Sequence, residues 1–510
     1  MLQHDQVVTM THLSRRPSRS RLVALALTAL PALTVLSVLA GCTHEPPDPA
    51  TQPATDGSGH DVGVQLFQWT WDAIADECTT TLGPDGYAWV LTSPPQEHIT
   101  GPQWWTSYQP VSYRLDSRLG TREQLAAMIA TCHDAGVDVR VDAVINHMSG
   151  QDVPGTGWAG SSYSHYDYPG TWTEQDFHHC GLTLDDDIAV YFDREQVQTC
   201  ELVNLADLDT GAPTVRARLT AYLEDLVSLG VDGFRIDAAK HMAAEDVAAI
   251  LDPLPDDVAI MQEVIRGSTE PITPDEYVRN GQVYEFTYGK ELRGMMAGSP
   301  GLALTIGGAS ARYVPSADAV AFVENHDTER NGSTLSYRDG ASDALATVLM
   351  LAGTYGTPQV YSGYAFSDRD AGPAQDADGR VLDARCAADA APTADLADGD
   401  WVCQHRWPQV AGMVGWRAVV GDAPVVDTWS DDRAVALGRG QRGFVVVNLG
   451  DDELRTTLPT SLPDGEYCDV LTGTGTGGSD DCVVTRVHDG QVDVVVPPLR
   501  AAAWDVARTR

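Results

Sequence analysis

The 510-residue sequence is short of positive charge: 33 Lys and Arg stand against 72 Asp and Glu, which gives a formal net charge of −39 at pH 7. Such a charge repels the phosphates of nucleic acids and the anionic surfaces of membranes, so neither is expected to bind the folded protein. The sequence has no CxxC pair, which argues against a thiolate zinc site. It has no internal repeat, and no GxGxxG follows its first strand-like segment, which argues against a dinucleotide-binding sheet.

The N-terminus has the pattern of an export signal. Basic residues precede an apolar run from Leu22 to Ala40, and small residues follow. The ending LAGC is similar to a bacterial lipoprotein box, so we expect a lipoprotein-type signal peptide over residues 1–41 and a lipid on Cys42. Plain signal cleavage and an uncleaved anchor helix are the alternatives. Residues 42–60 form a Pro-rich polar tether. The protein is therefore expected to be exported, and either anchored at the cell surface through Cys42 or secreted.

Nine cysteines are present, and Cys42 is one of them. The other eight are an even set, which is typical of disulfides in an exported protein. Spacing alone does not give their connectivity. The eight are Cys78, Cys132, Cys180, Cys200, Cys386, Cys403, Cys468 and Cys482.

Short apolar runs alternate with amphipathic helical stretches from about residue 62 onward. Strand–helix alternation predicts a parallel sheet. Eight runs in roughly 350 residues favour a closed (β/α)₈ TIM barrel, with an open doubly wound sheet as the alternative. The eight runs are residues 62–67, 87–95, 137–147, 231–239, 258–265, 283–288, 319–327 and 358–363.

Two segments depart from this alternation. Residues 148–200, after the third strand, are rich in Gly, Ser, Tyr, Asp and His, which predicts an irregular inserted subdomain. After about residue 418 the helical periods end, and apolar runs separated by Gly and Asp predict a C-terminal antiparallel β-domain. The expected domains are the barrel over 61–146 and 207–417, the inserted subdomain over 147–206, and the β-domain over 418–510.

Carboxylates stand at the ends of four predicted strands: Asp142, Asp237, Glu263 and Asp327. In a TIM barrel the chemistry lies at the C-terminal ends of the strands. A single strand-end Asp is usually a helix cap or a turn former. Four of them make that interpretation much weaker, and basic residues accompany them. These are His147, Arg235, His241 and His326.

Arg235 and Asp237 share one face of their strand, because residues i and i+2 point the same way. The guanidinium is expected to lower the pKa of Asp237 and keep it ionised. Glu263 is expected near two anions, which would raise its pKa and keep it protonated. One ionised and one protonated carboxyl suit glycoside hydrolysis. A structural salt bridge is the alternative, but it explains only one pair.

Seven segments, taken in order, resemble motifs of the α-amylase superfamily of glycoside hydrolases, and most of all its animal-type and actinobacterial members. The segments are WWTSYQPVSY (104–113), VDAVINHMSG (141–150), CELVNLADLDT (200–210), GFRIDAAKHM (233–242), QEVI (262–265), FVENHD (322–327) and WVCQHRW (401–407). The resemblance implies an extracellular, endo-acting enzyme. It would hydrolyse internal α-1,4-glucosidic bonds of starch, glycogen and maltooligosaccharides, with retention of configuration through a covalent glycosyl-aspartate.

Three other functions stay open: an α-glucan transglycosylase, a short-oligosaccharide hydrolase, and a catalytically idle lipoprotein that captures glucans. The intact carboxylates Asp237, Glu263 and Asp327 argue against the last of these. We expect α-glucans as the partners and a monomeric protein.

The resemblance also implies residue roles. Asp237 is similar to the nucleophile, Glu263 to the general acid/base, and Asp327 to the carboxylate that holds sugar hydroxyls. The residues implied in substrate binding are Trp104, Trp105, Tyr108, Gln109, Asp142, His147, Arg235, Lys240 and His326. Asp142 is similar to the supporting aspartate behind the nucleophile. Without the resemblance, the aromatic residues of this set could equally be core.

A structural calcium ion between barrel and insert is implied as well, with Asn146, Asp207 and the carbonyl groups of Gln198 and His241 as ligands; several hard oxygens suit this ion. Animal-type members bind chloride with two arginines and an asparagine. Arg235 and Asn325 match, but Gln359 replaces the second arginine, so chloride binding is not expected. The implied disulfides are Cys78–Cys132, Cys180–Cys200, Cys386–Cys403 and Cys468–Cys482.

Overall fold

The computed structural model describes residues 60–305, 312–387, 390–392, 395–472 and 482–510. The predicted signal peptide, Cys42 and nearly all of the tether lie outside the described residues. The described residues all belong to one compact unit. Over the described ranges, no helix is both long enough and apolar enough to cross a membrane.

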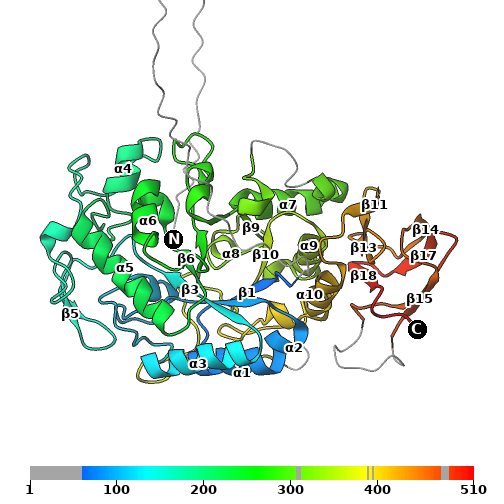
Figure 1. The fold of residues 1–510 in the computed structure, drawn as a ribbon, viewed down its shortest axis with the longest axis horizontal. Coiled ribbons are helices and arrows are strands. Elements are labelled where there is room, and N and C mark those ends of the chain that lie inside the picture. The colour runs from blue at the N-terminus through cyan, green and yellow to red at the C-terminus, as the bar shows by residue number, and fades with distance from the viewer. Residues whose placement is uncertain (1–59, 306–311, 388–389, 393–394, 473–481) are drawn as a thin grey trace, which may run out of the picture. The chain divides into compact units, whose positions relative to one another are not determined.

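Eight parallel strands close into a barrel in the order β1-β10-β9-β8-β7-β6-β3-β2. The predicted barrel is confirmed, and each of its strands falls on one of the eight apolar runs, although β8 and β10 begin one residue before theirs. Helices surround the strands (Figure 1). The barrel strands are β1 (Gly63–Leu66), β2 (Trp89–Thr92), β3 (Asp138–Ala143), β6 (Gly233–Ile236), β7 (Ala259–Gln262), β8 (Gln282–Tyr284), β9 (Ala319–Phe322) and β10 (Thr357–Ser362).

The helices begin and end at recognisable signals. The Thr121 side chain accepts a hydrogen bond from Gln124 N, and Gln124 Oε1 accepts one from Thr121 N, which is a capping box at the start of α3. Pro213 stands in the first turn of α5. The helices of the barrel are α1 (Trp71–Glu77), α2 (Gly83–Asp85), α3 (Arg122–Asp134), α5 (Pro213–Ser228), α6 (Ala244–Leu251), α7 (Phe286–Gly298), α8 (Thr328–Asn331), α9 (Ala341–Ala352) and α10 (Pro408–Val420).

The segment between β3 and β6 has little regular structure, as its composition predicts. It contains the two-stranded sheet β4 (Gly155–Thr156) and β5 (Ser162–Tyr163) and the short helix α4 (Arg194–Thr199). The disulfide Cys180–Cys200 closes this region. A segment with so few ladder hydrogen bonds depends on such cross-links and on contacts with the barrel.

All four implied disulfides are present, so the pairing is confirmed. Cys78–Cys132 joins α3 to the segment after α1, and the Cα atoms of the two residues lie 5.0 Å apart. Cys386–Cys403 and Cys468–Cys482 close short loops of the later part of the chain. The eight cysteines other than Cys42 are thereby all used.

The C-terminal β-domain consists of two four-stranded antiparallel sheets, with orders β11-β12-β13-β18 and β14-β17-β16-β15. Side chains of both sheets, such as Trp504 and Val494, share one apolar core. The strands are β11 (Val425–Ser430), β12 (Ala434–Arg439), β13 (Gly443–Asn448), β14 (Leu454–Pro459), β15 (Gly465–Cys468), β16 (Val484–His488), β17 (Gln491–Val496) and β18 (Arg500–Asp505).

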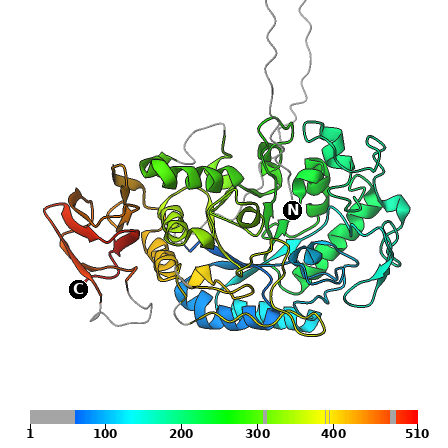
Figure 2. The same ribbon diagram turned by 180° about the vertical axis from the view of Figure 1, so that it is seen from behind.

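Helix α9 packs between the barrel and this domain. All of its residues from Asp343 onward are buried. Arg417 on α10 and Arg439 on β12 donate hydrogen bonds to the carbonyl groups at its C-terminus, with Arg417 Nη1 at 2.8 Å from Gly353 O and Arg439 Nη1 at 3.1 Å from Ala352 O. Seen from behind, α9 and α10 lie beside the C-terminal strands (Figure 2), and Trp416 Nε1 donates to Trp504 O at 2.9 Å.

A pair of buried carboxyl groups anchors the end of β9 to α9. Glu324 and Asp343 are 4% and 1% exposed, and each carboxyl group shifts the pKa of the other. Two carboxyl groups in this arrangement must share a proton. Burial raises the pKa of Asp343 to about 7 and that of Glu324 well above its usual range, and the nearby Glu329 and Asp339 raise both further.

This pair predicts a loss of stability as the pH rises from about 4 to about 7. Unfolded carboxyls release their protons near pH 4, whereas the native pair keeps its proton to about pH 7. The native state therefore binds more protons across this window, so its free energy of unfolding should fall as the pH rises, by about 1.4 kcal/mol per pH unit from this pair. Asp343→Asn should flatten that dependence in denaturant titrations. The exposed Asp432→Asn should not. Equal slopes for all three proteins would show that the pair shares no proton.

Candidate active site

The predicted site residues converge at the C-terminal ends of β3, β6, β7 and β9. Asp142 lies on β3, Asp237 follows β6 and Glu263 follows β7, and these three strands are neighbours in the barrel. Asp237 N donates to Ala143 O at 3.0 Å, which holds the nucleophile candidate in register with β3. The carboxyl groups that the sequence places at separate strand ends therefore lie close together in the structure.

The Arg235 guanidinium contacts three carboxyl groups. Its Nη1 atom donates to Asp142 Oδ1 at 2.5 Å and to Asp237 Oδ1 at 2.9 Å. Its Nη2 atom lies 3.0 Å from Glu263 Oε2, an ion-pair distance without the alignment of a hydrogen bond. One buried cation cannot balance three ionised carboxylates, so at least one of them keeps a proton at neutral pH.

Asp237 has one oxygen held and one oxygen available. Oδ1 is held by Arg235, while Oδ2 is buried and has no hydrogen-bond partner among the described residues. Burial raises the pKa of Asp237, and the Arg235 charge opposes this rise without cancelling it. The expectation of a lowered pKa is therefore wrong in its net direction, because the carboxyl is only 3% exposed and loses most of its hydration.

Glu263 is held by the backbone after the nucleophile candidate. Ala238 has a left-handed conformation (φ 51°), which is uncommon for a residue with a Cβ atom. In this turn its N–H donates to Glu263 Oε2 at 3.0 Å. Burial is the largest cause that raises the pKa of Glu263, and the charges of Asp237 and Asp327 raise it further, so the predicted direction is confirmed.

Asp142 lies behind these groups and is fully buried. The Tyr108 hydroxyl donates to its Oδ2 atom at 2.8 Å, and Arg235 occupies its Oδ1 atom. Burial raises the pKa of Asp142 to about 7. With both oxygens occupied, Asp142 can orient Arg235 and Tyr108 but presents no free atom to a ligand.

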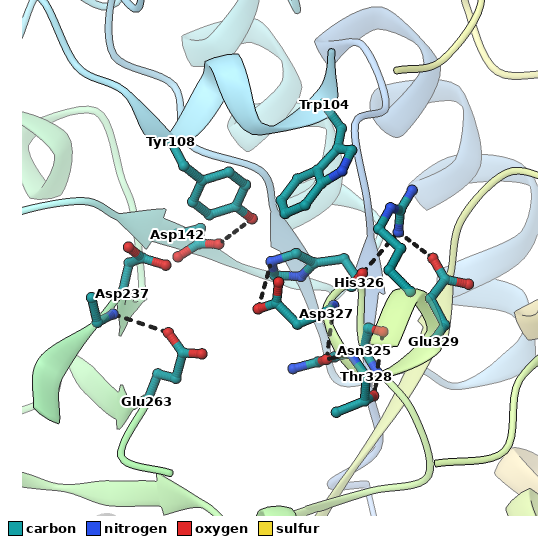
Figure 3. A network of polar contacts seen from close by, with 12 residues as sticks. Trp104, Tyr108, Asp142, Asp237, Glu263, Asn325, His326, Asp327, Thr328 and Glu329 are labelled. Carbon is teal, nitrogen blue, oxygen red and sulfur yellow. Dashed lines mark hydrogen bonds and ion pairs between the residues drawn. The ribbon is translucent and has the colours of Figure 1, made fainter. Parts of the chain in front are cut away.

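Asp327 and His326 face the Asp237–Glu263 pair from the other side (Figure 3). Asp327 directly precedes α8, and the Asn325 side chain accepts hydrogen bonds from the Asp327 and Thr328 N–H groups at 3.0 and 2.9 Å. His326 Nε2 lies 3.5 Å from Asp327 Oδ2. The carboxyl groups of Asp237, Glu263 and Asp327 therefore border one space.

Trp104 and Tyr108 lie above that space (Figure 3), on the 3₁₀ turn Trp104–Tyr108. Trp104 Nε1 donates to Arg369 O at 2.9 Å, and Trp105 is partly exposed beside it. Gln109 points elsewhere: its Oε1 atom accepts from Gly150 N in the insert at 3.0 Å.

Two basic residues of the predicted set have local partners. The Lys240 ammonium donates to Ile265 O at 2.8 Å and pairs with Glu270. His147 is fully buried and donates from Nε2 to Tyr108 O at 3.0 Å. Both side chains therefore stabilise loops around the site. The Lys240 ammonium and the His147 Nε2–H group already have protein partners.

Two of the implied calcium ligands, Asn146 and Asp207, lie close together between β3 and the insert. The backbones of His147 and Asp207 pair in an isolated antiparallel β-bridge, and Leu208 N donates to Asn146 O at 3.0 Å. Asn146 Oδ1 is buried and has no hydrogen-bond partner in the described part of the chain. An unused hard oxygen beside a carboxylate fits a calcium ion. His178, which the sequence did not suggest, donates from Nδ1 to Asp207 Oδ2 at 2.7 Å.

Gln359, the residue that bears on the chloride prediction, lies on β10 and is buried. Its Oε1 atom accepts a hydrogen bond from the Tyr284 hydroxyl at 2.6 Å. Asn325 directs its Oδ1 atom to the backbone of α8, as described above. No described contact of either residue brings a positive charge to this position.

Several residues of the site carried no signal in the sequence. Arg118 is 1% exposed and donates to Gln103 O at 3.0 Å and Trp104 O at 3.2 Å, which fixes the backbone of the aromatic turn. Arg330 donates to His326 O at 2.8 Å, and Gln65 contacts the His326 ring. These contacts join segments far apart in the chain, so spacing could not reveal them.

Comparison with known proteins agrees with this geometry. The sequence model of the α-amylase catalytic domain matches residues 91–264, and that of the α-amylase C-terminal all-β domain matches residues 429–507. An α-amylase of Streptomyces violaceus is 45% identical over 441 residues, 86% of this chain and 74% of that protein. An α-amylase-related protein of Drosophila melanogaster is 40% identical over 437 residues, 82% of this chain and 86% of that protein.

Solved structures agree as well. Wild-type α-amylase I from Eisenia fetida has a TM-score of 0.81 at 34% identity, over 88% of this chain and 97% of that one. A variant of the same enzyme in complex with maltohexaose has a TM-score of 0.81 at 33% identity, with the same coverage. The barrel, the strand-end acids and these matches lead to one conclusion: the chain belongs to the α-amylase family of glycoside hydrolases.

Proposed function

We propose that the protein is an extracellular endo-acting α-amylase that hydrolyses internal α-1,4-glucosidic bonds of starch, glycogen and maltooligosaccharides with retention of configuration. The observation that carries this proposal is the Arg235 guanidinium, which contacts both Asp237 and Glu263 and leaves Asp237 Oδ2 without a partner among the described residues. Two carboxyls gathered on one cation suit a double displacement, in which both act on the same bond.

In the first step, Glu263 gives its proton to the glycosidic oxygen while Asp237 Oδ2 attacks the anomeric carbon. The C–O bond to the leaving sugar breaks, and a glycosyl ester of Asp237 forms. Arg235 keeps Asp237 Oδ1 in place, so the free oxygen is the one that reacts. The raised pKa of Glu263 supports its role as the proton donor.

In the second step, the Glu263 carboxylate takes a proton from water, and the resulting hydroxide attacks the anomeric carbon and releases Asp237. Two inversions at that carbon give net retention. Asp327, beside His326 and opposite the other two acids, would hold the sugar hydroxyls while the ring distorts. Trp104, Trp105 and Tyr108 would stack against the neighbouring glucose rings. The complex of the Eisenia fetida enzyme with maltohexaose supports a maltooligosaccharide as the ligand.

The calcium ion belongs to the proposal too. Asn146 Oδ1, Asp207 and the carbonyl groups of Gln198 and His241 would hold it, and the unpartnered Asn146 Oδ1 atom supports this. Bound there, the ion would join the sparsely structured insert to the barrel without taking part in the reaction.

Chloride is not part of the proposed site. A neutral amide at Gln359, already bonded to Tyr284, adds no positive charge to that of Arg235, and Arg235 contacts three carboxyl groups. An additional anion there would have little to stabilise it.

The predicted export signal supports an extracellular glucan as the substrate. Four disulfides fit an oxidising compartment. The sequence around Cys42 supports a lipid anchor, and the net charge of −39 disfavours binding of the folded body to an anionic membrane surface. We take the protein to act as a monomer.

Asp237→Asn should lower turnover of soluble starch by at least ~10³-fold, because it removes the nucleophile while the fold is retained. Reducing-end release and the circular dichroism spectrum measure the two effects. The exposed Asp451→Asn is the matched control and should keep wild-type turnover. A ladder of oligosaccharides from the wild type would support internal cleavage. Near-normal turnover of Asp237→Asn would rule out the proposed mechanism.

Chelation should destabilise the protein. With calcium at about 100 times its Kd, removing the ion should lower the free energy of unfolding by about 2.7 kcal/mol. Thermal unfolding with EDTA, followed by added calcium, measures this loss and its recovery. Asn146→Ala should make the protein insensitive to both additions, whereas Asn331→Ala, at an exposed position, should respond like the wild type. A wild type indifferent to EDTA and calcium would argue against the site.

Chloride should leave turnover unchanged. After exhaustive dialysis into acetate, the rate on soluble starch should be the same in sodium chloride and in sodium acetate of equal ionic strength, because Gln359 supplies no charge. Gln359→Arg is the positive comparison, since it restores the second arginine. A several-fold increase of the wild-type rate with chloride would contradict this part of the proposal.

A further inference from the structure

Gln65 lies at the centre of β1 and is 1% exposed. Its amide nitrogen Nε2 lies 3.3 Å from His326 Nδ1, a contact that joins residues 261 positions apart in the sequence. A buried amide that contacts a ring nitrogen influences which of the two ring nitrogens carries the proton.

The His326 ring is fixed from several directions. It stacks between Phe67, with ring centroids 4.6 Å apart, and Tyr108, with centroids 5.2 Å apart. Trp104 contacts it edge to face at 5.6 Å. The ring therefore cannot rotate to exchange its two nitrogens without displacing these aromatics. Nδ1 faces Gln65, and Nε2 faces Asp327 at 3.5 Å.

His326 is neutral in this setting. Burial holds its pKa well below the usual range. Of the charged groups that face it, Asp327 raises the pKa, while Arg235 and Arg330 lower it. A neutral imidazole has one N–H and one bare nitrogen, so the position of its single proton decides what it can do for Asp327.

An amide nitrogen can only donate, so Nδ1 must accept and cannot carry the proton. We propose that Gln65 is a positioning residue that fixes the tautomer of His326, with the proton on Nε2 directed at Asp327 and at the sugar hydroxyls that Asp327 binds. This inference rests on the proposed function. It adds a reason for the polar residue in the centre of β1, where the neighbouring Val64 and Leu66 are buried apolar residues.

The proposal can be tested without any assay of activity. In wild-type protein labelled with ¹⁵N-histidine, the His326 resonances should be those of a neutral ring with the proton on Nε2, from acid to neutral pH. Loss of these signals in His326→Asn assigns them. A wild-type ring with its proton on Nδ1, or a charged ring at neutral pH, would overturn the proposal.

Two variants of Gln65 separate a tautomer effect from a packing effect. Gln65→Met keeps the length of the side chain and removes the donor, so kcat on soluble starch should fall about 2- to 10-fold at every pH. Gln65→Glu replaces the donor with an acceptor, which draws the remaining proton of a neutral ring to Nδ1 and raises the pKa of His326.

The pH profile is the decisive measurement. Gln65→Glu should be active while His326 is charged, and its kcat should fall about 10- to 100-fold as the pH rises through the raised pKa, because Nε2 then loses its proton. Wild type and Gln65→Met should lack this step. Identical profile shapes for all three would overturn the proposal. Failure of the proposed function would look different, since wild type itself would then release no reducing ends while its His326 tautomer stayed measurable.

Discussion

The site depends on one buried cation among three acids. Arg235 holds Asp142, Asp237 and Glu263 within ion-pair distance while being almost completely shielded from water. Without the guanidinium, these carboxyls would repel one another and take up further protons. With it, one acid can stay charged beside another that keeps its proton. The barrel makes this possible, because it places the four side chains on, or directly after, three adjacent strands.

Much of this arrangement could be read from the sequence. The eight apolar runs predicted the strands, because parallel strands buried on both faces are continuous in apolar residues. The acids at their ends predicted the site, since the carboxyl ends of barrel strands meet at one face. The disulfide pairs followed from resemblance to relatives, and the structure has the same four.

Two kinds of feature could not be predicted from the sequence. They are the extent to which a side chain is buried and the contacts between residues far apart in the chain. The net pKa shift of Asp237 needed the extent of its burial, which outweighs the neighbouring Arg235. The pairing of Lys240 with Glu270, and the approach of Gln65 to His326, join loops and strands that no local pattern relates. The left-handed turn at Ala238 could not be predicted either, because this backbone conformation is typical of glycine and not of alanine.

The burial of α9 has a consequence for how the chain folds. Nearly every residue of this helix is covered, and Arg417 and Arg439 close its C-terminus against the β-domain. A barrel synthesised without residues beyond Val420 would leave part of this apolar surface open to water, and would lose β12 with its Arg439. The catalytic barrel and the C-terminal sheets are therefore expected to melt together in a single transition, and the β-domain acts as an obligatory part of the enzyme's core.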